Sequence, residues 1–401
     1  MRLKLFIVII IAVALSSCRR DLYVYGDEFH SVTLDVDWRE YSDSDPDGMS
    51  CWFFPHDEKR QPSYVKTANV RHADLYLGHG DYTGVIIDYS PEEYSRQEFL
   101  GMDRASTARV VLTPASYQPD DSVNLSQLYG KECFHETLPI VRETGYYEVS
   151  NTAEMMALDT LENMHIKSGE YGDYIPYEVR DTYQSTLAVQ KFSSVPATPI
   201  WRMRIRIFVK GLDYLWSTEA SLAGLATGRY LALNKPTDDP CLISLTDWEI
   251  QRTGNNEGYI SITFNNFGLR GSQHPYRSYD NEGHDITPNA DGSSRDYGNS
   301  RATTRSMPGN VVDWYSTRSV RPEDLRLNLM FTLRDRATVL YYHYDVGEYV
   351  VSFDNQLVLR LELGPDFPNG PDLPYVDAYE SAGFDAEVTP WEDGGNADVP
   401  M

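Results

Sequence analysis

Apolar and polar residues alternate strictly along three stretches of the chain. In residues 201–209 every second residue is apolar, and Arg202, Arg204 and Arg206 stand between them. Residues 32–38 and 325–333 repeat the same period of two. Because successive side chains of a β-strand point to opposite faces, this pattern predicts strands with one buried face and one face in water.

Shorter apolar or β-branched runs lie between these stretches, bounded by Gly, Pro, Asn and Asp. They are residues 49–55, 64–69, 74–77, 82–89, 109–112, 187–192, 259–264, 339–346, 348–353 and 357–363. Many short strands with turns between them predict a mainly β protein built of antiparallel sandwiches. The 29 tyrosines agree with this class, because tyrosine packs its ring in a sheet and keeps its hydroxyl in water.

Three stretches fit this pattern less well. Residues 152–164 carry apolar side chains broadly on one side and predict a helix, with a strand within 158–166 as the alternative. Residues 220–233, rich in small residues and glycine, predict a loop or a weak helix. Residues 268–310 form a long polar insertion that we expect to be mobile.

The N-terminus reads as a bacterial lipoprotein signal. Arg2 and Lys4 precede an apolar run over residues 5–15, and small residues lead into Cys18. The run is shorter than the roughly 20 residues that span a bilayer, which argues against a transmembrane anchor. Cleavage before Cys18 predicts a mature chain that is exported and tethered by acyl chains, palmitate among them, on that cysteine.

The chain length and the positions of prolines predict the domain organisation. A chain of 401 residues suggests two or three domains, and prolines near residue 197 mark a boundary. The predicted parts are the signal peptide 1–17, a lipidated spacer 18–28, an N-terminal β-sandwich 29–196, a C-terminal β-sandwich 197–393 that contains the insertion, and a flexible tail 394–401.

The charge of the chain excludes some partners. The formal net charge is −25, and it becomes −27 when Arg2 and Lys4 leave with the signal peptide. So acidic a chain is a poor partner for nucleic acid. The arginines of residues 201–209 suggest either a basic binding stripe or the solvated face of a strand, and the second interpretation is the simpler one.

Cysteine usage leaves two interpretations open. With Cys18 lipidated, Cys51, Cys133 and Cys241 remain, and their spacing fits no zinc or redox motif. They are either one disulfide with a thiol left over or three buried thiols that act as small apolar groups.

No motif of catalysis stands out in the sequence. There is no nucleophile elbow, P-loop, zinc-protease helix or dinucleotide glycine pattern. His72 and His79 lack an evident third ligand for a metal. We therefore expect a protein that is not an enzyme and that holds no cofactor and no metal.

Short motifs along most of the chain resemble one family. They are residues 18–22 (CRRDL), 45–49 (DPDGM), 52–55 (WFFP), 80–82 (GDY), 101–103 (GMD), 205–212 and 220–226 (ASLAGLA). In their order they resemble the fimbrillin-like and fimbrial-anchor lipoproteins of Bacteroidales-type bacteria. The resemblance implies two tandem transthyretin-like antiparallel β-sandwich domains and a structural or adhesion role, as anchor or accessory subunit, without catalysis.

The same resemblance implies how subunits join and where they sit. Family subunits associate by β-strand addition, and Phe384, Ala386 and Val388 alternate with acids as a candidate donor strand. The implied partners are other fimbrial subunits, and the implied location is the outer membrane. Surface exposure is favoured over the periplasm, although Arg19 and Arg20 stand where export signals of these bacteria are acidic.

A surface glycan-binding lipoprotein is the alternative function. Exposed Trp rings stack on sugars, and Trp314 and Trp391 lie in polar stretches. Trp38 and Trp201 lie on the apolar phase of their strands, so we expect them in the core. A structural subunit is expected to show an open sheet edge, and a glycan binder an aromatic platform beside hydrogen-bonding groups.

Overall fold

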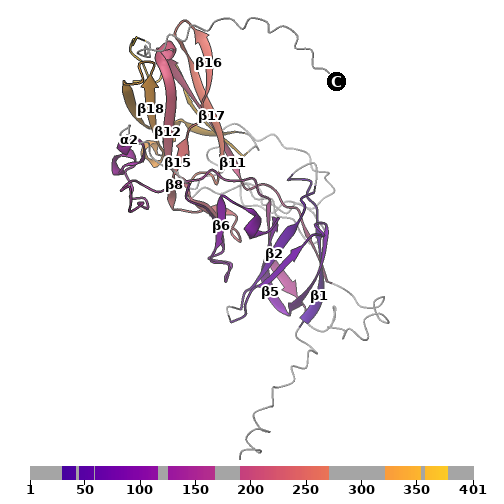
Figure 1. Cartoon of the computed structure of the whole chain (residues 1–401). Helices are drawn as coiled ribbons and strands as arrows, with labels where there is room; N and C mark the ends of the chain where they lie inside the picture. Colours follow the sequence, from indigo (N-terminus) through magenta and orange to yellow (C-terminus); the bar gives the residue numbers. More distant parts are fainter. Residues whose placement is uncertain are drawn as a thin grey trace, which may run out of the picture.

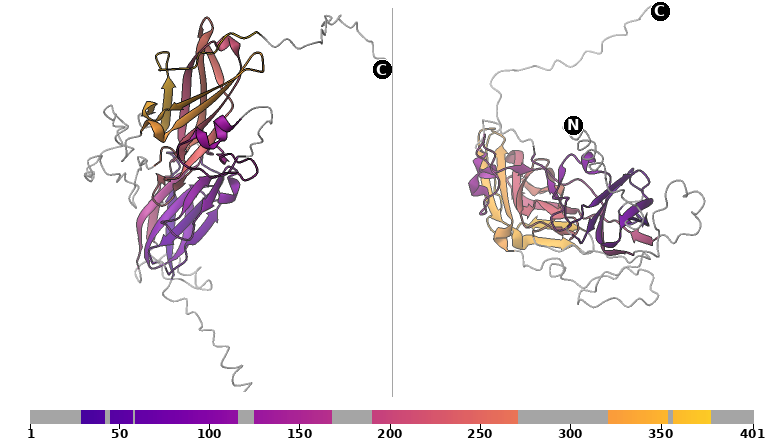
Figure 2. Two further views of the ribbon diagram at one scale, coloured as in Figure 1. Left: turned by 90° about the vertical axis from the view of Figure 1, so that its left-hand side faces the viewer. Right: turned by 90° about the horizontal axis from the view of Figure 1, so that it is seen from below.

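The computed structural model describes residues 29–41, 45–57, 59–115, 125–167, 190–270, 321–353 and 357–377. Within them the chain forms five β-sheets arranged in two lobes, one above the other (Figures 1 and 2). The prediction of a mainly β protein made of antiparallel sandwiches is confirmed. The finer prediction, a transthyretin-like tandem, stays a prediction.

The N-terminal lobe, at the bottom of Figure 1, pairs two sheets. Sheet A has the order β10 (Gln190–Ser194), β1 (Phe29–Val36), β4 (His72–Gly78). Sheet B has the order β3 (Ser63–Thr67), β2 (Met49–Pro55), β5 (Gly80–Asp88), β9 (Leu158–Ile166). The two sheets enclose a core that includes Val32, Leu34, Trp38, Phe53 and Ile86.

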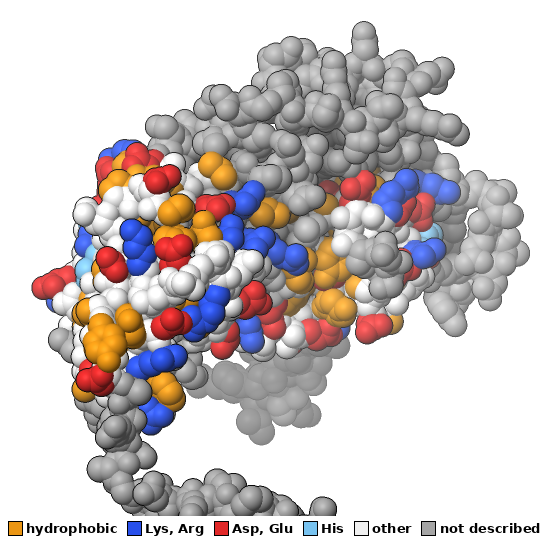
Figure 3. Space-filling model, turned by 90° about the horizontal axis from the view of Figure 1, so that it is seen from above, with side chains coloured by type: hydrophobic (Ala, Val, Ile, Leu, Met, Phe, Trp, Pro, Cys, Tyr) orange, Lys and Arg blue, Asp and Glu red, His pale blue; other side chains and the backbone are white. Residues whose placement is uncertain are grey.

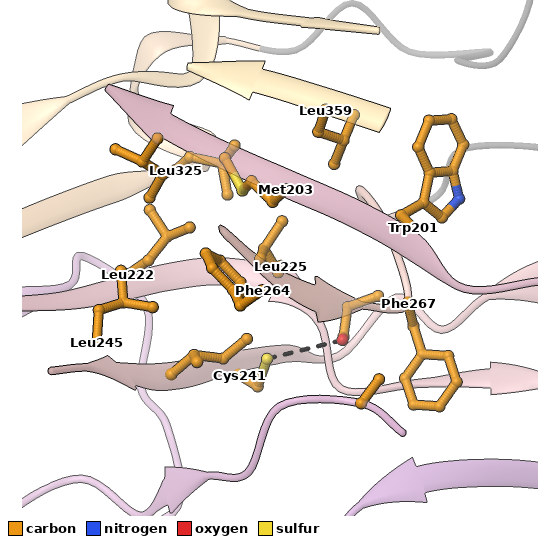
Figure 4. Packing of buried hydrophobic residues seen from close by; sticks show 14 of the residues in the cluster. Trp201, Met203, Leu222, Leu225, Cys241, Leu245, Phe264, Phe267, Leu325 and Leu359 are labelled. Atoms are coloured by element: carbon orange, nitrogen blue, oxygen red, sulfur yellow. Dashed lines mark hydrogen bonds between the residues drawn. The ribbon is translucent and has the colours of Figure 1, made fainter. Parts of the chain in front are cut away.

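The C-terminal lobe, at the top of Figure 1, pairs two five-stranded sheets. Sheet D has the order β19 (Val339–Asp345), β18 (Arg326–Leu333), β12 (Leu215–Ala226), β15 (Pro240–Leu245), β8 (Val149–Ser150). Sheet E has the order β16 (Glu249–Gly254), β17 (Glu257–Asn266), β11 (Trp201–Lys210), β21 (Val358–Leu363), β20 (Val350–Phe353). Figure 4 shows side chains of both sheets interdigitating, with the Cys241 thiol donating to the Ala226 carbonyl oxygen at 3.6 Å.

Sheet C links the lobes. Its order is β14 (Lys235–Pro236), β13 (Gly228–Tyr230), β7 (Arg109–Leu112), β6 (Gln97–Leu100). One short α-helix and five 3-10 turns complete the described elements: α2 (Ser126–Tyr129), η1 (Pro91–Glu93), η2 (Lys131–Cys133), η3 (Leu212–Tyr214), η4 (Pro322–Asp324) and η5 (Gly347–Tyr349).

Both lobes repeat one arrangement of strands. The first strand of each lobe, β1 or β11, pairs antiparallel with one neighbour and parallel with the last strand of its lobe, β10 or β21. A parallel pair requires a long crossover connection. The beginning and the end of each lobe are therefore joined side by side in one sheet.

Strand pairs cross the predicted boundary at residue 197. β7 pairs with β13, and β8 pairs with β15, so strands from before the boundary lie in sheets with strands from after it. Residues 125–149 also cover the outer face of sheet D, where Leu128 and Tyr129 pack against Leu242 and Met330. The division of the chain at that residue stays a prediction.

Two expectations about individual segments are wrong. Residues 158–166 form strand β9, which confirms the alternative given for this segment and not the helix. Residues 220–233 contain β13 and the second half of β12, not a loop or helix. Residues 158–161 of β9 and residues 220–226 of β12 are buried on both faces. A strand that is buried on both faces loses the alternation by which strands are recognised. β9 is held in the extended conformation by pairing with β5, and β12 by pairing with β15 and β18.

Gly228 is a sensitive point of the link between the lobes. A Cβ atom at this position would lie 2.1 Å from the Val110 carbonyl oxygen of β7. We predict that Gly228→Ala lowers the free energy of unfolding by about 2 kcal/mol or more, because β7 must move to admit the methyl group. Urea denaturation measures the loss.

Gly364→Ala is the matched control for this variant. Its added Cβ meets no atom within 4 Å. A Gly-to-Ala change at a compatible site stabilises by roughly 0.4–1 kcal/mol through the unfolded chain. Equal stability of the two variants would contradict the tight approach of β13 to β7.

Candidate functional site: the open edges of the C-terminal lobe

Sheet E ends on one side in strand β16, which has the marks of a protected edge. All six of its residues are exposed, and it carries Glu249 and Arg252. Its register with β17 shifts between Arg252 and Gly254. Charged side chains and bulges discourage further strand pairing. Ile250, at 54% exposure, is its one large exposed apolar side chain.

The edges on the opposite side of the lobe lack this protection. Strand β19 ends sheet D, and residues 339–344 (VLYYHY) contain no Lys, Arg, Asp or Glu. Seven consecutive residues of β19 pair with β18 without a register shift. Strand β20 ends sheet E with the uncharged sequence VVSF, and Val351 is 45% exposed. Long, regular, uncharged edges are the type that accepts an added strand, and β19 fits this description better than the four-residue β20.

The C-terminal segment 364–377 lies next to these edges. The hydroxyl of Tyr344 donates to the Asn369 carbonyl oxygen at 2.9 Å, and that of Tyr342 to the Asp372 carbonyl oxygen at 3.3 Å. The ring of Phe367 packs edge-on against Tyr344 and Tyr349. Burial raises the pKa of both Tyr342 and Tyr344, so both hydroxyls remain donors at neutral pH.

His343 ties β19 to the segment that covers sheet D. Its Nδ1 lies 2.8 Å from the Asn328 side-chain oxygen, and its Nε2 lies 2.8 Å from the Gln127 side chain. Asn328 is oriented by donating its amide to the Cys133 carbonyl oxygen at 3.1 Å. The Gln127 atom is Oε1, so both ring nitrogens face amide oxygens, and a neutral imidazole can donate to only one of them. Burial, helped by the Arg326 charge and opposed by Glu132, lowers the pKa of His343.

The buried ionisable groups of the described residues have structural partners. Asp88 Oδ1 accepts from the Tyr94 hydroxyl at 2.6 Å and from the Ala157 amide at 2.7 Å, and burial raises its pKa. Arg229 is fully buried and donates to the Asn234 side chain at 2.7 Å, and burial lowers its pKa to about 9. No group of three or more potential metal ligands is found within the described residues.

Cys51, Cys133 and Cys241 are buried free thiols, so of the two interpretations the unpaired one holds. Burial raises the pKa of each thiol to about 12. They pack as small apolar groups and are poor nucleophiles.

Several predicted site residues lie outside the described residues. These are the lipidation site Cys18, the donor-strand candidates Phe384, Ala386 and Val388, and the freer tryptophans Trp314 and Trp391. The described residues include only the first three of the polar insertion. There Arg270 forms a bidentate pair with Glu136, both distances being 2.8 Å.

The burial of two tryptophans was predicted correctly, and a third tryptophan is exposed that the sequence analysis did not single out. Trp38 and Trp201 are each 2% exposed, as predicted for core residues. Trp216 is 55% exposed, with the Arg336 guanidinium 3.9 Å from its ring centroid. Seen from the outer end of the C-terminal lobe, hydrophobic side chains form small groups separated by charged ones (Figure 3). No helix in the described part of the chain is long and apolar enough to cross a bilayer.

These features define a two-lobed β-sandwich protein with one protected and one unprotected side. Residues 16–246 match the model of a family described as a domain of unknown function, DUF5119, and the chain belongs to that family. No curated protein sequence matches the chain.

Solved structures share this architecture. A candidate adhesin from Bacteroides ovatus matches with 13% identity and a TM-score of 0.51, over 87% of this chain and 94% of that protein. The fimbrial anchor protein Mfa2 from Porphyromonas gingivalis matches with 10% identity and a TM-score of 0.34, over 83% and 90% of the two chains. The predicted resemblance is confirmed at the level of the fold by the Bacteroides ovatus structure.

The lowered pKa of His343 predicts that stability depends on pH. A folded pKa below the ordinary value of 6.5 means that the unfolded chain binds more protons just below that pH. This contribution to stability is complete above pH 6.5 and is lost as the pH falls toward the folded pKa. We expect His343→Gln to flatten the decline of the thermal midpoint between pH 7 and pH 5.

His72 supplies a control of opposite sign. Its hydrogen bond with Asp35, at 2.7 Å, raises its pKa. Its stabilisation is therefore present below pH 6.5 and is lost as the pH rises through the folded pKa, and it is small because the ring is half exposed. If His72→Gln flattened the acid-side decline and His343→Gln did not, the assignment would be wrong.

Proposed function

We propose that this chain is a lipid-anchored structural or adhesion subunit of a fimbria-like assembly on the outer membrane. It acts as an anchor or accessory subunit and joins other fimbrial subunits by β-strand addition. It does so without catalysis and needs no cofactor. Surface exposure is favoured over the periplasmic face.

The main support is the position of the two ends of the described chain. Strand β1 enters at the outer end of the N-terminal lobe, where Phe29 pairs with Gly78 (Figure 1). The chain leaves at the opposite end of the C-terminal lobe, where Tyr375 contacts Tyr214 at 5.3 Å between ring centroids (Figure 2). A lipid on Cys18 would hold the first end at the membrane and direct the second end outward.

The unprotected side of the C-terminal lobe supports the joining mechanism. An extended partner segment beside β19 or β20 gains backbone hydrogen bonds along an edge that carries no repelling charge. Phe384, Ala386 and Val388, which follow the end of the described chain, form the candidate donor of such a strand. The fold shared with the Bacteroides ovatus candidate adhesin is consistent with this role.

The lipid anchor is tested by Cys18→Ala. The variant lacks the sulfur that carries the acyl chain, so it should not incorporate labelled palmitate and should leave the membrane fraction. Fractionation and metabolic labelling measure both effects, with Cys133→Ala as a control that keeps Cys18. Unchanged membrane retention of Cys18→Ala would exclude the lipid anchor.

The acceptor edge is tested by a matched pair of lysine substitutions in sheet E. Val351→Lys places a charge on β20, and Ile250→Lys places one on β16, at similarly exposed positions. Crosslinking on intact cells should show most of the mixed-subunit product lost in Val351→Lys and retained in Ile250→Lys. Equal retention would place the joint elsewhere.

The donor strand is tested in the same assay. Phe384→Asp with Val388→Asp removes the apolar alternation and should abolish transfer of this chain's tail to a partner. Asp385→Asn with Glu387→Gln keeps the apolar residues and should leave it intact. Recovery of polysaccharide alone in the crosslinked material would contradict the subunit function.

A further inference from the structure

The outer face of sheet E carries a stripe of arginines. On β11, Arg202 and Arg204 are exposed, and Arg206 is half-buried. Within the described residues neither the Arg202 guanidinium nor the Arg204 guanidinium has a hydrogen-bond or ion-pair partner. Since alternate residues of a strand share one face, the three guanidinium groups repeat at roughly 7 Å along β11.

The neighbouring strand adds to this positive charge. Arg360 of β21 pairs in register with Arg204, and Glu362 pairs with Arg206. Glu362 lies 3.3 Å from both Arg206 and Arg360. The four guanidinium groups of β11 and β21 therefore outnumber the carboxylates of their rows, Glu362 on β21 and Glu249 on β16 opposite Ser261. This holds although the chain as a whole has a net charge of −25.

The strand on the other side supplies neutral hydrogen-bonding groups. In the antiparallel register of β17, Asn265 stands opposite Arg202, Thr263 opposite Arg204 and Ser261 opposite Arg206. Each row of the face thus sets a guanidinium beside an amide or a hydroxyl. Phe208 and Tyr259 follow as an edge-to-face aromatic pair with centroids 5.2 Å apart. The Arg206 guanidinium lies 3.7 Å from the Tyr259 ring centroid.

We infer that this face, the arginine face, is a binding site for an acidic polysaccharide. Guanidinium groups bind carboxylate or sulfate groups through two parallel hydrogen bonds. The adjoining amide and hydroxyls are matched to sugar hydroxyls, and the half-buried ring of Phe208 offers apolar surface to a sugar ring. The face combines the two kinds of group that a charged, hydroxyl-rich polymer requires.

The geometry favours a polysaccharide over an acidic peptide. An extended peptide gains most at a sheet edge, where its backbone hydrogen bonds are satisfied. On the face of a sheet those backbone groups would find no ladder to join. A polysaccharide has no backbone amides and meets this face with charged groups and hydroxyls alone.

Binding is tested with the full mature chain and immobilised polygalacturonate. Arg202→Gln with Arg204→Gln should weaken binding roughly tenfold or more, because each lost charge-assisted hydrogen bond is costly. Arg104→Gln with Arg142→Gln, at two exposed arginines away from sheet E, changes the net charge equally and should bind like the wild type. Raising the salt from 50 to 300 mM should weaken the wild type strongly.

A conservative variant separates geometry from charge. Arg202→Lys with Arg204→Lys keeps both charges but loses the bidentate fork, so its affinity should fall between those of the wild type and the glutamine variant. Unchanged thermal midpoints confirm that these exposed substitutions leave the fold intact. Val351→Lys adds a positive charge to the row of Arg360 and Arg204, so it should bind at least as tightly as the wild type. Loss of assembly and loss of glycan binding are therefore distinguishable.

Three results would overturn the inference. Equal weakening in the two glutamine pairs would mean that binding follows net charge and not the arginine face. Equal affinity for polyglutamate would assign the face to acidic protein segments. Absence of binding to polygalacturonate and to chondroitin sulfate at 50 mM salt would exclude an acidic polysaccharide.

Discussion

The burial of sheet B on both faces is the constraint on which the arrangement of the lobes depends. Phe53 and Ile86 face the core of the N-terminal lobe, whereas Trp52, Phe54 and Val85 face the opposite way. The second set belongs to one continuous apolar cluster that runs through β7 into the C-terminal sandwich. Burial of apolar surface stabilises a fold by roughly 25 cal/mol per Å². Because these side chains are large and buried at the junction, separation of the lobes is unfavourable.

This shared core also explains why strands within residues 97–151 pair with strands of the second half of the chain. Strand β7 places Val110 and Leu112 in the cluster and pairs with β13, and β8 extends sheet D beside β15. In the proposed function the chain is anchored at one end and loaded at the other, so force must pass between its lobes. Backbone pairing and a packed core across the junction carry such a load better than a linker does.

Alternation identified the strands whose two faces meet different surroundings. β11 and β1 were predictable because one face of each is buried and the other is wet, and β7 was predicted with its correct ends. β9 was predicted only as the alternative to a helix, and β12 was missed, because part of each strand is buried on both faces and loses the period of two. The pairing of a strand from one half with a sheet of the other half depends on contacts between residues far apart in the chain. A local sequence pattern does not predict such contacts.

The candidate sites differ in the same way. The arginines of β11 were visible in the sequence, but their surplus of charge became evident only when β21 set Arg360, and not a second acid, beside Arg204. An unprotected edge is likewise a property of sheet order. The sequence VLYYHY predicts a strand, but only the strand order shows that this strand lies at the edge of sheet D.

The edge and the face of sheet E present different chemistry, and this allows them to act independently. An edge offers backbone groups, and it recognises any extended segment whose side chains do not clash or repel. A face offers side chains only, so it discriminates by charge and by the spacing of donors. A subunit that needs many protein contacts of one kind and a selective hold on a charged polymer gains from separating them. The outward row Val351, Arg360, Arg204 and Thr263 connects the two surfaces, because it begins on the edge strand β20 and ends beyond the arginine stripe.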